Sequence, residues 1–110
     1  MKRQATLILL ASLFAYPAAA SSGDAWKEFA AEVQAKCLGA AGSAIEDAKV
    51  VVDPFGSESY GLAIVSGKAK GTDTHISQIC VYDKSTKMVQ IGSELSDDVV
   101  KIDIPASAAR

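Results

Sequence analysis

Cys37 and Cys80 are the two cysteines of this 110-residue sequence, and they limit its folding more than any other feature. They predict one disulfide, which would close a loop of about 43 residues and stabilise the fold by roughly 4 kcal/mol. A redox pair would have closely spaced cysteines, and a zinc site would need more ligands than the single His75 adds. We therefore expect a structural disulfide, with no metal and no cofactor.

The first 20 residues have the layout of a secretory signal peptide. Lys2 and Arg3 supply a positive start, residues 5–16 are almost entirely apolar, and residues 18–20 are three alanines. The apolar run is shorter than the roughly 20 residues of a membrane-spanning helix. It also lacks the polar face of an amphipathic anchor, which is the alternative interpretation. We expect residues 1–20 to be removed, leaving residues 21–110 as one domain that is periplasmic or secreted and not stably inserted in a membrane.

Composition excludes several classes of function. Lys2 and Arg3 leave with the predicted signal peptide, so 9 basic residues face 13 acidic ones and the net charge becomes −4. An acidic chain without a basic stripe disfavours nucleic-acid binding. Residues 21–110 are also too few for a multidomain enzyme, and a domain of this size gains much from a covalent crosslink.

The order of apolar patterns predicts an α+β fold. Residues 24–38 place Trp26, Phe29, Val33 and Cys37 on one helical face, with Gly39 suited to a left-handed conformation after the helix. Residues 45–49 are ambiguous and suit a short turn, whereas several later segments have strand character. These predicted strands are residues 50–52, 60–68, 75–82, 88–91 and 99–104. Their short connections predict one N-terminal helix packed on a four- to five-stranded antiparallel meander, with one disulfide joining helix and sheet.

The loop from Asp53 to Tyr60 is the most informative segment outside the predicted core. Its candidate partner-binding residues are Phe55, Ser57, Glu58 and Tyr60, because an exposed aromatic on a turn can anchor a protein partner. Two alternatives remain open. Phe55 could fold back onto the sheet edge, and the edge itself could bind a partner by strand addition.

No motif in the sequence indicates catalysis. His75 is interpreted as a solvated residue at the start of a strand, and no serine lies in a Gly-x-Ser-x-Gly elbow. The acidic pairs lack the spacing of a calcium loop and are interpreted as a solvated face. A cleft that gathers His75 with two acids would argue against this interpretation.

Together these features predict an exported, periplasmic, non-enzymatic protein-binding module of the bacterial envelope. Such a module would act as an inhibitor, an accessory factor or an envelope or host-interface factor, with another protein as its partner and no nucleic acid. The alternatives are a small-ligand or metal carrier and a structural envelope protein.

Overall fold

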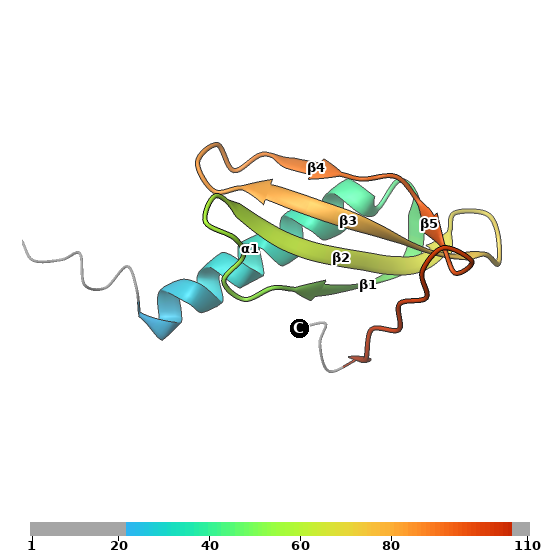
Figure 1. Cartoon of the computed structure of the whole chain (residues 1–110), viewed down its shortest axis with the longest axis horizontal. Coiled ribbons are helices and arrows are strands. Elements are labelled where there is room, and N and C mark those ends of the chain that lie inside the picture. Colours follow the sequence, from blue (N-terminus) through green and yellow to red (C-terminus); the bar gives the residue numbers. More distant parts are fainter. Residues whose placement is uncertain (1–21, 107–110) are drawn as a thin grey trace, which may run out of the picture.

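The computed structural model describes residues 22–106 and confirms the predicted α+β class (Figure 1). The predicted signal peptide lies outside the described residues. Helix α1 (Gly23–Ala41) precedes five strands, which are β1 (Ile45–Val52), β2 (Tyr60–Ala69), β3 (His75–Asp83), β4 (Val89–Ile91) and β5 (Leu95–Ser96). The strands form one antiparallel sheet in the order β1-β2-β3-β4, and β5 pairs with β3 beyond the end of β4. The predicted meander is therefore also confirmed.

Helix α1 begins at a polar cap and ends later than predicted. The Ser22 hydroxyl accepts a hydrogen bond from the amide of Ala25, which satisfies one of the free donors at the helix start. The predicted end at Gly39 is wrong, because the helix continues to Ala41 and Gly42 caps it in a right-handed conformation. Ala41 is fully buried in the core, so its packing outweighs the cost of about 1 kcal/mol for a glycine inside a helix.

Gly39→Ala is expected to stabilise the protein by about 0.5–1 kcal/mol, because Gly39 is an exposed helical glycine. A methyl group at this position would meet no atom within 4 Å. Urea denaturation of the two proteins measures the change. A destabilised variant would show that the last helical turn is not formed in solution.

The disulfide joins the end of the helix to the middle of the sheet. Cys37 and Cys80 are bonded, their Cα atoms are 5.9 Å apart, and both residues are fully buried. The predicted disulfide is therefore confirmed. Since Cys80 faces α1, the alternation of side chains along β3 turns its neighbours Ile79 and Val81 to the opposite face.

Strand β1 begins earlier than predicted and contains an irregularity. The ambiguous residues 45–49 belong to this strand, since β1 starts at Ile45, but its pairing with β2 shifts register between Glu46 and Lys49. Asp47 within this stretch has a φ of 53°. The segment thus combines strand pairing with the turn-like backbone of a bulge, which explains its ambiguous sequence pattern.

The predicted strand at residues 99–104 is wrong. The amides of Val99 and Val100 both donate to the carbonyl of Ser96, and this tight turn leads the chain off the sheet. By this point β3 already pairs with β2 on one side and with β4 and β5 on the other. Val99 and Val100 pair with no described strand after this turn, and both are exposed, whereas Ile104 is buried.

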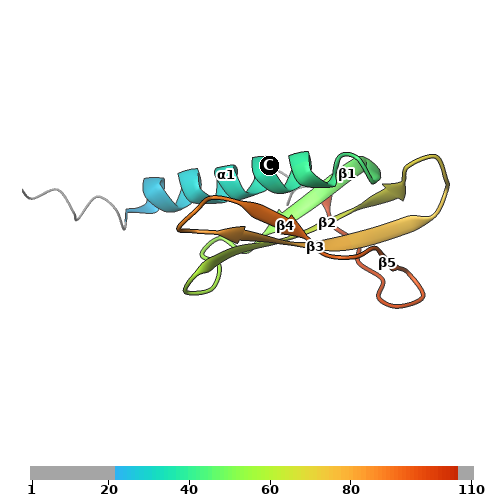
Figure 2. The same ribbon diagram turned by 90° about the horizontal axis from the view of Figure 1, so that it is seen from above.

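Helix α1 covers one face of the sheet and leaves the other face without a helix. Figure 2 shows α1 along one side, while the loop that follows β5 lies on the opposite side. The core between helix and sheet includes Val33, Val65 and the two half-cystines. We call the side of the sheet turned away from α1 the open face.

Tyr82 is the buried aromatic residue that connects β3 to the helix by a polar bond. Its hydroxyl donates to Oε2 of Glu32 over 2.6 Å, and its ring packs edge-on against Phe29. Burial, together with the neighbouring carboxylate of Glu32, raises the pKa of Tyr82 to about 12.

Tyr82→Phe is expected to cost about 1 kcal/mol at neutral pH and to reduce the loss of stability under alkaline conditions. The pKa of Tyr82 in the folded state lies above the usual value of 10.0. The neutral phenol therefore makes its full contribution to the free energy of unfolding below pH 10.0, and this contribution is lost as the pH rises towards about 12. Chemical denaturation at neutral pH and at intervals across this window measures both effects.

Candidate functional site

The loop between β1 and β2 is held in one shape by two side chains. Oδ1 of Asp53 accepts hydrogen bonds from the amides of Phe55 and Gly56, at 3.1 and 3.0 Å, and these bonds lower the pKa of Asp53. Gly56 has a φ of 71°, in the region that favours glycine, so the predicted turn is confirmed. The Ser57 hydroxyl accepts a hydrogen bond from the amide of Tyr60, and the Ser57 amide donates one to the Tyr60 carbonyl. Ser57 therefore closes the loop.

Phe55 packs beside the first turns of helix α1. Its ring lies edge-on to Trp26 with centroids 5.1 Å apart, and 56% of the residue remains exposed. Nζ of Lys84 donates to the carbonyls of Phe55 and Ser57 and lies 5.7 Å from the centroid of the Trp26 ring. Glu58 is exposed in the same loop. The loop is therefore attached to the helix side of the molecule.

Tyr60 lies on the opposite side of the sheet from Phe55. Its neighbour Gly61 faces the helix so closely that a methyl group there would lie 2.7 Å from Cγ2 of Val33. Because side chains alternate along a strand, Tyr60 faces the open face, where 45% of it is exposed. The structure thus does not gather Phe55 and Tyr60 into one patch.

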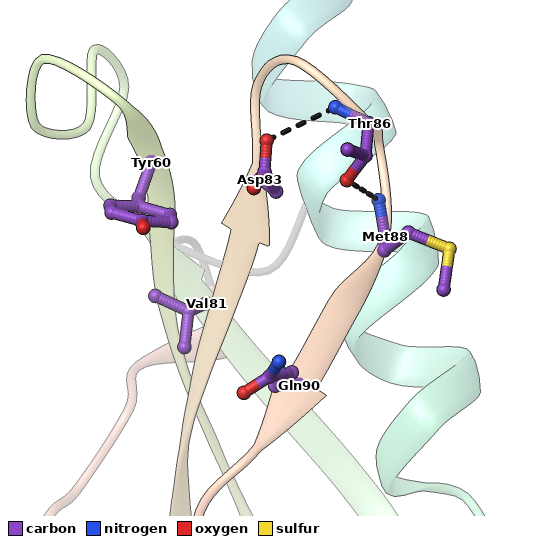
Figure 3. Close-up of a pocket in the computed structure, with 6 residues that line it drawn as sticks. All are labelled: Tyr60, Val81, Asp83, Thr86, Met88 and Gln90. Carbon is purple, nitrogen blue, oxygen red and sulfur yellow. Dashed lines mark hydrogen bonds between the residues drawn. The ribbon is translucent and has the colours of Figure 1, made fainter.

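A pocket of about 490 Å³ lies on the open face at the end of β3 (Figure 3). Its lining combines one aromatic, two apolar, two uncharged polar and one acidic residue, which are Tyr60, Val81, Asp83, Thr86, Met88 and Gln90. The strands set this lining, because Tyr60 pairs with Asp83 across β2 and β3 and Val81 pairs with Gln90 across β3 and β4.

Asp83 is held rigidly at the edge of this pocket. Its Oδ1 accepts hydrogen bonds from the amides of Ser85 and Thr86, at 2.8 and 3.0 Å, and these bonds lower the pKa of Asp83. The carboxylate is therefore charged at neutral pH. It keeps this position as long as the hairpin is folded, because both amides belong to the turn. The sequence pattern assigned no role to this residue.

Apolar residues continue from the pocket along the open face. Ile79, in the middle of β3, is 52% exposed, and its partner Ile64 on β2 is partly exposed. Val81 connects Ile79 to the pocket, since it is the next residue of β3 on this face. Sequence reasoning missed this surface, although the position of Ile79 next to a half-cystine would have indicated its outward direction.

His75 and Asp97 form a second polar site at the other end of β3. Nδ1 of His75 lies 2.8 Å from Oδ1 of Asp97, and each side chain is 38% exposed. A shallow pocket of about 220 Å³ is lined by both residues together with Asp103. His75 therefore does start a strand and contact solvent, as predicted, but a shallow pocket also gathers it with two acids, and this argues against the interpretation of His75 as merely solvated.

The hydroxyl groups nearer the core do not complete a nucleophilic set with this histidine. Ser66 and Ser77 are buried, and their Oγ atoms bond to each other over 2.6 Å. A nucleophilic serine would instead bond to the histidine.

The described residues contain neither a metal-binding cluster nor a membrane-spanning helix. Between residues 22 and 106, no three or more His, Cys, Asp or Glu side chains are grouped to hold a metal ion. Over the same range, no helix has both the length and the apolar character needed to cross a membrane. No protein-family model, no curated protein and no solved structure matches this chain.

Proposed function

We propose that the chain is an exported, non-enzymatic module that binds another protein on the open face of its sheet. The observation that carries this proposal is the exposure of Ile79 in the middle of the central strand β3, beside the pocket at Tyr60. A contiguous apolar surface on a small domain marks an interaction site. Protein interfaces typically have an apolar centre with a polar rim, and aromatic residues contribute strongly to them.

Two features support export to the bacterial periplasm. One is the predicted signal peptide, and the other is the buried Cys37–Cys80 disulfide, which is compatible with an extracytoplasmic protein. The partner would then be another periplasmic or envelope protein, towards which the chain acts as an inhibitor or accessory factor.

The experiment compares capture of proteins from a periplasmic extract by three forms of the chain. Wild type and Phe55→Ala should recover the same partner, whereas Ile79→Ser should lose it, because only Ile79 lies on the open face. Both substitutions change half-exposed side chains, so the fold should survive them, and thermal melting checks this. The captured partner is then purified and its affinity for each form is measured by calorimetry.

Other outcomes would favour the other functions. A partner lost by Phe55→Ala but kept by Ile79→Ser would move the binding site to the predicted loop. Absence of any reproducible partner would favour a structural envelope protein.

Catalysis at His75 is the second candidate function, because a carboxylate-bound histidine can act as a general base. Its test is a hydrolase screen of purified wild type and His75→Ala. Activity that disappears in the variant would overturn the non-enzymatic proposal.

A further inference from the structure

The pocket on the open face has one formal charge in its lining. Asp83 is the only carboxylic acid among the six lining residues, and no basic residue is among them. The adjacent Lys84 forms no ion pair with Asp83. Nζ of Lys84 instead donates to the carbonyls of Phe55 and Ser57 on the helix side. The pocket therefore presents negative charge beside an aromatic ring.

The carboxylate of Asp83 has capacity for another donor. Its Oδ1 accepts from the amides of Ser85 and Thr86, and a hydrogen bond from the Thr86 side chain also lowers its pKa, but a carboxylate has about four acceptor positions and can take a further donor. Figure 3 shows the Tyr60 ring beside this carboxylate, with Val81 below them and the Gln90 amide across the strand. A ligand here would meet a carboxylate oxygen, an aromatic face and an apolar floor.

We infer that this pocket binds the guanidinium group of an arginine side chain on the protein partner, an inference that rests on the proposed binding function. A planar cation stacks on an aromatic ring and donates in its own plane to a carboxylate. The open face extends the fit, because Val81 and Ile79 can contact the aliphatic part of the arginine.

Arginine suits this lining better than the other cations. A lysine ammonium is strongly hydrated and would lose more water than one carboxylate oxygen replaces. A calcium ion needs six or more oxygen ligands, and the pocket has a single carboxylate. The guanidinium is weakly hydrated and gains from the ring of Tyr60 as well as from the charge of Asp83.

The test uses a blocked peptide with one arginine between leucines, titrated into ¹⁵N-labelled protein and followed by NMR. Citrulline and lysine versions of the same peptide are the comparison probes, since citrulline keeps the shape of arginine without its charge. The arginine peptide should shift the amides of Tyr60, Asp83 and Gln90. Its affinity should exceed that of the citrulline peptide by about tenfold or more, as expected for a charge-assisted bond.

Asp83→Asn removes the charge but keeps an Oδ1 that can accept the two turn amides, so the hairpin should form. This variant should lose about tenfold in affinity for the arginine peptide. Asp53→Asn is the matched control, because Oδ1 of Asp53 accepts the same kind of turn bonds in the other loop. The control should bind as wild type does.

Equal binding of the arginine and citrulline peptides would overturn the inference, as would wild-type affinity in Asp83→Asn. Lack of any binding to the arginine peptide, or shifts confined to the site at His75 and Asp97, would overturn it too. These failures differ from failure of the proposed function, which is decided by whether capture of a partner depends on Ile79.

Discussion

Replacing both Cys37 and Cys80 with alanine is expected to lower the free energy of unfolding by about 4 kcal/mol. The disulfide joins residues 43 positions apart, so removing it restores much conformational freedom to the unfolded chain. A domain of this size should then melt roughly 15–30 °C lower. The double substitution is preferred because it leaves no free thiol. Calorimetry of the two proteins under the same conditions measures the difference.

Reduced wild type is the control for this prediction. It should melt close to the double alanine variant, because both lack the crosslink while keeping the rest of the core. Two free thiols in an Ellman titration of native protein would contradict the disulfide itself. A loss below about 1 kcal/mol would mean that the crosslink adds little to the packing around it.

Gly67→Ala is expected to destabilise the protein by about 1–3 kcal/mol or more, because strand β2 passes close to β1 at this residue. A methyl group on Gly67 would lie 2.5 Å from Cγ2 of Ile45 and 2.6 Å from the carbonyl oxygen of Glu46. The carbonyl belongs to the irregular part of β1, so relief of the clash requires the backbone to shift. Urea denaturation measures the loss.

Gly39→Ala is the matched control for Gly67→Ala. The chemical change is identical, but no atom lies within 4 Å of the added methyl group at Gly39. The two variants should therefore change stability in opposite directions. Equal effects would show that backbone freedom, and not close packing, determines the response to alanine at both sites.

Local chemistry made much of the fold predictable. The spacing of apolar residues from Trp26 to Cys37 specified the helix, since one face had to be buried. Pro54 and Gly56 predicted a turn, because proline fixes its own φ and glycine tolerates a positive φ, and Gly56 has a φ of 71° in the structure. The even number of cysteines, in a chain with a predicted signal peptide, predicted the disulfide.

Features that depend on distant contacts were not predictable. The helix passes Gly39 because Ala41 is buried against the sheet, and the valines after β5 form no strand because their amides bond back to Ser96 in a tight turn. The same holds for the site. Phe55 and Tyr60 are close in sequence, but only the pairing of β2 with β3 and the approach of Gly61 to the helix place them on opposite sides.

The disulfide also determines which residues of β3 the open face presents to the proposed partner. Neighbouring residues of a strand face opposite ways, so a shift of β3 by one position would exchange its inner and outer side chains. Because Cys80 is covalently tied to the helix, such a slip would require the bond to break. The crosslink therefore determines which side chains of β3 lie on the outer surface, in addition to stabilising the core. In a reducing environment, no covalent bond would fix the orientation of β3. The outward direction of Ile79, Val81 and Asp83 would then depend on noncovalent packing and strand pairing alone.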